Sequence, residues 1–113
     1  MIKLLFRRIG ILFFFWVVSS CAYDELEMSE PIDCESVTFT ATILPIISTS
    51  CAITGCHVPG TGRQNFMDNN TIKNNAEEIE ERTQIRDMPR RGSLTQKQID
   101  QIACWVDNGA PLN

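Results

Sequence analysis

Two cysteines and one histidine within seven residues set the strongest limit on how this chain of 113 residues can fold. The segment reads Cys51-Ala52-Ile53-Thr54-Gly55-Cys56-His57, and His57 is the single histidine of the sequence. Thiols and imidazoles this close together favour one shared partner or one local cross-link. The nature of that partner depends on the compartment in which the chain folds.

The first twenty residues have the pattern of an export signal. Three basic residues, Lys3, Arg7 and Arg8, precede an apolar run over 9–18 that is too short to span a bilayer comfortably. The following Val18-Ser19-Ser20-Cys21 resembles the lipobox of bacterial lipoproteins. That resemblance implies a signal peptide over 1–20, a lipid on Cys21 and a protein of the cell envelope, on the periplasmic or the cell-surface side. The alternative is a short membrane helix with an incidental cysteine.

The charge of the remaining 93 residues is uneven. Three of the ten basic residues lie in the first twenty, so seven basic and fourteen acidic residues remain, a net charge of −7. Six acidic residues and no basic one fall within 21–36, which predicts a self-repelling tether. The segment 37–113 carries a net charge of −1 and holds one small domain. No basic field is present for phosphate contacts, so nucleic-acid binding is disfavoured.

Helical periodicity predicts an all-α domain of three to four short helices joined by long loops. One helix is expected to start near Thr42, with Pro45 in its first turn. A loop is expected over 58–71, followed by a surface helix over 76–83 with Asn74 or Asn75 as its cap and with Ala76, Ile79 and Ile85 on its apolar stripe.

The last helix is the most clearly marked element. Thr95 and Gln98 have the spacing of a capping box, and Leu94 and Ile99 that of a hydrophobic staple. Apolar residues then recur at helical spacing until Gly109 and Pro111 end the pattern. So few large apolar side chains predict a small core, which a cofactor or a covalent staple would complete.

Covalent haem attachment needs two thiols to bond the porphyrin and a histidine beside the second thiol to bind iron. Cys51, Cys56 and His57 satisfy this requirement with four residues between the cysteines, where two are usual. A regular helix would rotate two thiols five positions apart by about 140°. Residues 52–55 are therefore expected to loop outward, with Gly55 supplying backbone freedom.

The sixth ligand of such an iron has to come from elsewhere, because no second histidine exists. Met88, held by the following Pro89, is the preferred thioether donor, and Met67 is the rival. An isolated methionine is otherwise more often a core residue. Arg90 and Arg91 are candidates to neutralise haem propionates or to form a docking patch, and the simpler interpretation is a solvated basic turn.

These motifs, with Trp105-Val106 and Gly109-Ala110-Pro111 near the end, resemble the mono-haem cytochrome c domain of bacterial exported lipoproteins. The resemblance covers about residues 37–113. It implies a class I-like cytochrome c bundle around one covalent haem c, with Cys51 and Cys56 as thioether donors and His57 and Met88 as axial ligands. It also implies an N-terminal helix packed near the C-terminal one. The cysteine spacing and Arg90-Arg91, where a second proline is frequent, depart from the common pattern.

Cys34 and Cys104 are left once lipid and haem have taken the other three cysteines. An oxidising compartment favours a disulfide between them, and two separate thiols are the alternative. Trp105 is expected in the core, with a contact to the haem edge as the rival interpretation.

The leading functional prediction is electron transfer to and from unidentified redox partner proteins, by a membrane-anchored and non-enzymatic protein. The alternatives are a zinc site made by Cys51, Cys56, His57 and Cys104, and a structural lipoprotein stapled by two disulfides.

Overall fold

The computed structural model describes residues 30–113, and the predicted signal peptide, Cys21 and most of the predicted tether lie outside this range. The described part is helical, without strands, as the periodicity predicts. Its elements follow in the order η1 (Cys34–Ser36), η2 (Phe39–Ile43), α2 (Leu44–Ser50), α3 (Asn69–Asn74), α4 (Ala76–Gln84) and α5 (Gln96–Asp107). None of the helices within 30–113 has the length and hydrophobicity needed to cross a bilayer.

The first helical segment begins earlier than Thr42. A π-helical turn, η2, starts at Phe39 and runs directly into α2, which carries Pro45 in its first turn as expected. The Thr38 hydroxyl accepts a hydrogen bond from the Ala41 N–H at 3.3 Å and so caps η2. Burial of Phe39, which is 1% exposed, favours this earlier start because the extra turn carries the ring into the core.

The prediction that the loop runs to residue 71 is wrong at its end, because α3 begins at Asn69. The Asp68 carboxylate accepts a hydrogen bond from the Thr71 N–H at 3.0 Å, and Ile72 is fully buried. Asn75 precedes α4 as expected but does not cap it with its side chain; its amide nitrogen donates to the Thr71 carbonyl at 2.7 Å instead.

The apolar stripe expected for α4 is partly wrong. Ala76 and Ile79 are buried, but Ile85 is 65% exposed because α4 ends at Gln84 and the chain turns away. Thr83 takes the third buried position, and its hydroxyl donates to the Ile79 carbonyl at 2.9 Å. A polar side chain can occupy the core here because its hydrogen bond is satisfied within the helix.

The capping box of α5 is confirmed. The Gln98 N–H donates to the Thr95 hydroxyl at 3.2 Å, and the Thr95 N–H donates to the Gln98 side-chain oxygen at 2.9 Å. Leu94 and Ile99 are both buried, at 5% and 4% exposure, where the staple predicts them. Local sequence therefore fixes where this helix starts.

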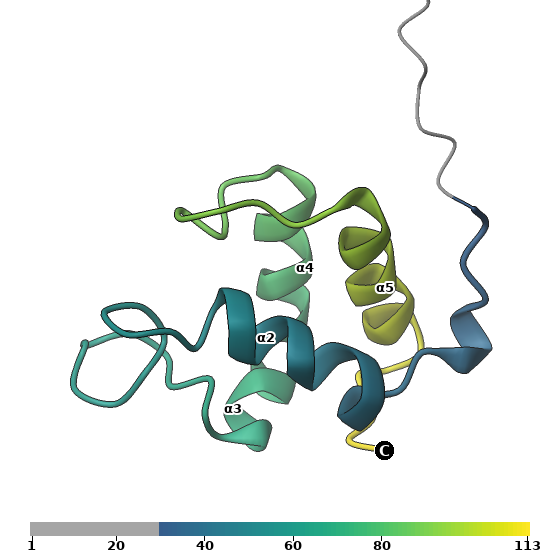
Figure 1. Ribbon diagram of the computed structural model, residues 1–113. Coiled ribbons are helices and arrows are strands. Elements are labelled where there is room, and N and C mark those ends of the chain that lie inside the picture. Colours follow the sequence, from purple (N-terminus) through teal and green to yellow (C-terminus); the bar gives the residue numbers. More distant parts are fainter. Residues whose placement is uncertain (1–29) are drawn as a thin grey trace, which may run out of the picture.

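The core lies where η2 and α4 meet α5, and α2, which continues η2, adds Ile46 and Ile47 to it (Figure 1). Trp105 is fully buried and packs on Phe39, with ring centroids 5.8 Å apart, and its indole N–H donates to the Pro111 carbonyl at 2.9 Å. Trp105 therefore belongs to the core, away from the cavity described below. Asn113 holds the start of η2, since its side-chain oxygen accepts from the Phe39 N–H at 2.9 Å.

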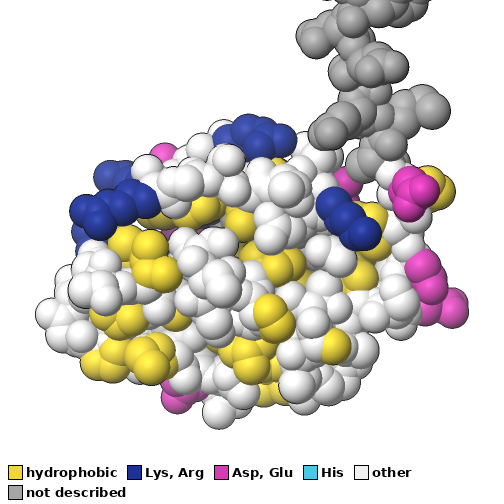
Figure 2. All heavy atoms as spheres, viewed as in Figure 1, with side chains coloured by type: hydrophobic (Ala, Val, Ile, Leu, Met, Phe, Trp, Pro, Cys, Tyr) yellow, Lys and Arg dark blue, Asp and Glu magenta, His cyan; other side chains and the backbone are white. Residues whose placement is uncertain are grey.

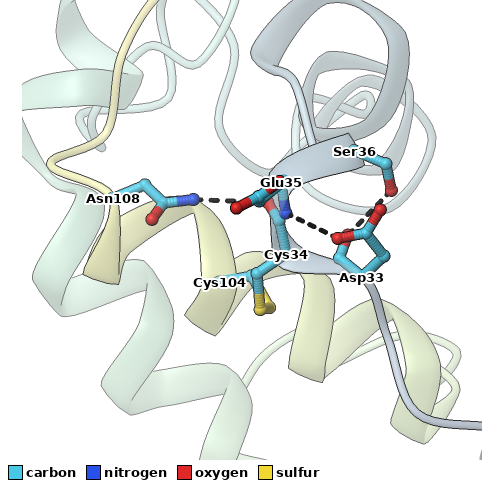
Figure 3. Close-up of a disulfide and its surroundings, with 6 residues drawn as sticks. All are labelled: Asp33, Cys34, Glu35, Ser36, Cys104 and Asn108. Atoms are coloured by element: carbon cyan, nitrogen blue, oxygen red, sulfur yellow. Dashed lines mark hydrogen bonds between the residues drawn. A yellow bond between two sulfur atoms is a disulfide. The ribbon is translucent and has the colours of Figure 1, made fainter.

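A disulfide between Cys34 and Cys104 fastens η1 to α5 (Figure 3). The two Cα atoms lie 5.2 Å apart, and the bond closes a sequence separation of 70 residues. The Asn108 amide donates to the Cys34 carbonyl at 3.3 Å beside it. The base of the predicted tether is thus bonded to the last helix.

Candidate cofactor site

One cavity of about 470 Å³ gathers the residues that the sequence singled out for haem. Cys51, Cys56 and His57 line it from the segment after α2, and Met88 lines it from the loop between α4 and α5. Its volume falls within the ~300–1,000 Å³ typical of cofactor pockets. The rival ligand Met67 does not line the cavity, and its side chain is 68% exposed.

The polypeptide leaves the helix at the first of the two cysteines. Cys51 is the C-terminal cap of α2, and residues beyond it form turns rather than a regular helix. The Cys56 N–H donates to the Ile53 carbonyl at 2.9 Å, and Gly55 has a positive φ of 81°. The His57 N–H then donates back to the Cys51 carbonyl at 3.1 Å. The segment 52–55 thus departs from the helix, as the widened spacing predicts, and Gly55 takes the left-handed backbone conformation.

The two thiols differ in environment. Cys51 is 8% exposed, whereas Cys56 is partly exposed, and neither forms a disulfide. Burial, with a smaller contribution from the nearby Cys56, raises the pKa of the Cys51 thiol to about 11. Cys51 is therefore protonated at physiological pH in this environment, which lowers its reactivity both as a nucleophile and as a metal ligand.

The imidazole of His57 is held by the segment that follows it. Its Nδ1 lies 3.1 Å from the Gln64 carbonyl oxygen, so the tautomer that satisfies this contact carries its proton on Nδ1. That tautomer leaves the Nε2 lone pair for a ligand, as in histidines whose second nitrogen binds a metal. The ring also stacks on Phe66, with centroids 4.2 Å apart and 8° between the planes.

Met88 is placed by the end of α4. The N–H groups of Asp87 and Met88 both donate to the Arg82 carbonyl, at 3.0 and 3.1 Å. The Arg82 guanidinium in turn pairs with the Asp87 carboxylate at 2.7 Å. These contacts fold the chain back after α4, so Met88 lies at the cavity although it is far from His57 in sequence.

Arginines surround the cavity. Four of the five arginines after residue 20 line it: Arg63, Arg82, Arg90 and Arg91. Arg63 donates to the Gly55 carbonyl at 3.0 Å and Arg82 is paired, whereas Arg90 and Arg91 make no hydrogen bond or ion pair with any residue in 30–113. Figure 2 shows basic side chains beside hydrophobic ones at the end of the molecule where the α4–α5 loop lies. The cavity thus offers free cationic groups next to an apolar lining.

Sequence reasoning missed Phe66 and Gln64 as parts of the site. Gln64 acts through its backbone carbonyl, which no residue type reveals. Phe66 had one available signal, because it is a single large aromatic residue in an otherwise polar, turn-rich segment. Such a residue in a loop usually anchors the loop to the core.

The fourth ligand suggested for a zinc site is engaged elsewhere. Cys104 is bonded to Cys34, and no group of three or more His, Cys, Asp or Glu side chains within 30–113 is arranged to hold a metal ion.

Comparisons of the chain with protein-family models, with curated proteins and with solved structures give no significant match. The site therefore has to be interpreted from its own chemistry.

Proposed function

We propose that this protein is a lipid-anchored, mono-haem c-type cytochrome that transfers electrons at the cell envelope. The observation that carries the proposal is the convergence of Cys51, Cys56, His57 and Met88 on one cavity. His57 and Met88 are 31 positions apart in the sequence, and they belong to separate loops. A covalently attached haem with histidine and methionine ligands requires a thiol pair, an imidazole and a thioether, and this cavity brings these groups together.

Each residue has a distinct role in holding the cofactor. The thiols of Cys51 and Cys56 form the two covalent links, Nε2 of His57 binds the iron, and the Met88 sulfur supplies the sixth ligand. Haem bound in this way supplies a one-electron redox couple, whose potential the methionine raises relative to bis-histidine ligation. Arg90 and Arg91, which have no partner within 30–113, are available for carboxylates at the cavity rim.

The helical arrangement also supports the proposal. η2 and α5 pack against each other through Phe39 and Trp105, as the cytochrome c resemblance implies for its N-terminal and C-terminal helices. The anchor is proposed from Cys21 and its lipobox, with the acidic segment as spacer. Electron transfer then needs no catalytic side chain, because the cofactor carries the chemistry.

The test is an absorption spectrum and an intact mass of the exported full chain, produced in a bacterium that assembles c-type cytochromes. We expect an intense Soret band and a mass equal to the chain from Cys21 plus lipid and one haem. Two double variants make a matched pair. Cys51→Ala with Cys56→Ala should abolish the covalent haem, and Cys34→Ala with Cys104→Ala should retain it, because neither of the latter lines the cavity.

Colourless wild-type protein that lacks the mass of a porphyrin would refute the proposal. The remaining alternatives would then be told apart by the same sample. Bound zinc would appear in elemental analysis, whereas a structural lipoprotein with a Cys51–Cys56 disulfide would be two hydrogens lighter than the dithiol. The Cys34–Cys104 disulfide is compatible with this last alternative but does not favour it, because Cys51 and Cys56 are unbonded in the structure.

A further inference from the structure

The chain from His57 to Phe66 closes on itself. The Phe66 N–H donates to the His57 carbonyl at 3.0 Å, so the segment returns to the point from which it left. Gly60 and Gly62 have positive φ angles of 83° and 73°, which allow the tight reversal between them. The closure brings the Phe66 side chain to the His57 ring.

The contact between the two rings covers one face of the imidazole. The rings are nearly parallel, with 8° between their planes and 4.2 Å between their centroids. Phe66 is 6% exposed and belongs to the hydrophobic core, whereas His57 is only partly buried. Phe66 is therefore the more tightly packed member of the pair, and the more exposed imidazole aligns with it.

Phe66 is also fixed from its C-terminal side. Two residues later, the Asp68 carboxylate caps α3, and the Asp68 N–H donates to the Asn65 carbonyl at 3.3 Å. The backbone on both sides of Phe66 is thus bonded, to His57 on one side and at the start of α3 on the other. A side chain held in this way can orient a neighbour.

The stack and the Gln64 carbonyl restrict the imidazole in different ways. The carbonyl oxygen, 3.1 Å from Nδ1, selects the tautomer and one edge of the ring. The Phe66 ring selects the plane in which the imidazole lies. With both restrictions in place, Nε2 is the ring nitrogen left without a partner in the described residues.

We propose that Phe66 is a positioning residue for His57: it holds the imidazole in one plane, so that Nε2 meets the metal centre of the cofactor in a single orientation. The role toward the metal rests on the proposed function, whereas the fixed ring orientation is a property of the polypeptide. A residue that packs against a metal ligand without binding the metal can fix the orientation of that ligand before the metal binds. Phe66 also lines the cavity, and the role proposed for it is to orient His57.

The test compares Phe66→Leu with Phe39→Leu in the exported full chain. Both replace a buried phenylalanine by leucine, but Phe39 packs on Trp105 and not on His57. NMR of the reduced protein, with labelled histidine, reports the tautomer and the number of ring conformers of His57. We expect one ring conformer, with the proton on Nδ1 and ring-to-ring NOEs to Phe66, in wild type and in Phe39→Leu.

In Phe66→Leu the preference for that conformer should fall roughly 2- to 10-fold, which corresponds to the loss of an aromatic stack. Phe66→Tyr, which keeps the ring, should restore it. A single unchanged conformer in Phe66→Leu, or the same loss in Phe39→Leu, would overturn the proposal. If Phe66→Leu does not fold, absence of the ring-to-ring NOEs in wild type overturns it equally.

The same spectra can be recorded on protein that carries no haem. A colourless sample from a host that assembles c-type cytochromes, in which His57 still shows one conformer that is lost in Phe66→Leu, would refute the cytochrome assignment and leave the positioning role of Phe66 standing. A haem-loaded sample in which Phe66→Leu leaves the single ring conformer of His57 unchanged would support the cytochrome assignment and refute the positioning role of Phe66. The two failures are thus distinguishable.

Discussion

At the scale of single residues, the two methionines of the described chain, Met67 and Met88, differ most in their tertiary placement. Met67 and Met88 both lie in loops, and both were candidates for the sixth ligand. Met88 lines the cavity that holds Cys51, Cys56 and His57, whereas Met67 projects from the surface at 68% exposure. The difference makes them a matched pair for substitution.

We expect Met88→Ala to lower the reduction potential by on the order of 0.1 V or more, a part of the ~0.8 V range that axial ligands control. Loss of the thioether removes a ligand that favours ferrous iron, and the ferric spectrum should move toward high spin. Met67→Ala should leave the potential and the spectrum unchanged. Redox titration followed by visible absorption measures both. An unchanged potential in Met88→Ala would exclude Met88 as a ligand and favour an open sixth position.

At the scale of elements, local sequence signals succeed where the cap and the buried face agree. In α5 the Thr95–Gln98 capping box and the buried Ile99 and Ile102 point to the same helix. In α3 the Asp68 cap exists, but its buried face consists of Ile72 alone, so periodicity gave no signal. In α4 the helix ends one residue before the predicted Ile85 contact. Whether a short helix forms, and where it ends, thus depends more on tertiary packing than on the periodicity of its apolar residues.

The start of α5 can be tested through its cap. Thr95→Ala should reduce the free energy of unfolding by about 1 kcal/mol, because it leaves the Gln98 N–H without its hydroxyl acceptor. Lys97→Ala is the control, since Lys97 is exposed in the same turn and outside the capping box. Urea denaturation followed by circular dichroism gives both values. Equal stability of Thr95→Ala and Lys97→Ala would mean that packing alone fixes the helix start.

At the scale of the whole molecule, the base of the predicted tether and the cavity are built from separate parts of the chain. The cavity is lined only by residues within 50–91. The base of the predicted tether is held by the Cys34–Cys104 disulfide, near the C-terminal end of α5, and by Asn108, which follows that helix (Figure 3). Changes at the disulfide should therefore affect stability without altering the cavity.

Removing the disulfide with Cys34→Ala and Cys104→Ala should lower the free energy of unfolding by about 4 kcal/mol, from the chain entropy of a 70-residue loop. Chemical denaturation of the exported protein measures this change. The visible spectrum and the reduction potential, recorded on the same samples, should be unchanged. An altered spectrum would show that the bond also shapes the cavity, and unchanged stability would show that the native contacts hold the tether base without it.

The sequence by itself determined the helical class, the ends of α5 and the chemical identity of the candidate ligands. These features depend on residue types and on their spacing over a few positions, and the amino-acid sequence gives both directly. Cys51, Cys56 and His57 were therefore identified together, and the outward turn at Gly55 followed from their spacing. The covalent cofactor itself stays a prediction until the spectrum and the mass are measured.

Only the tertiary structure decided which distant groups meet. The sequence favours Met88 over Met67, a core position for Trp105 and a Cys34–Cys104 disulfide, each against an alternative. The structure lines the cavity with Met88, buries Trp105 and contains the disulfide, and it brings Phe66 onto His57, which sequence reasoning missed. Such contacts join residues from 9 to 70 positions apart, and their formation depends on how the helices share one small core. No local pattern encodes that choice, because it is made by packing and by the backbone hydrogen bonds of the loops.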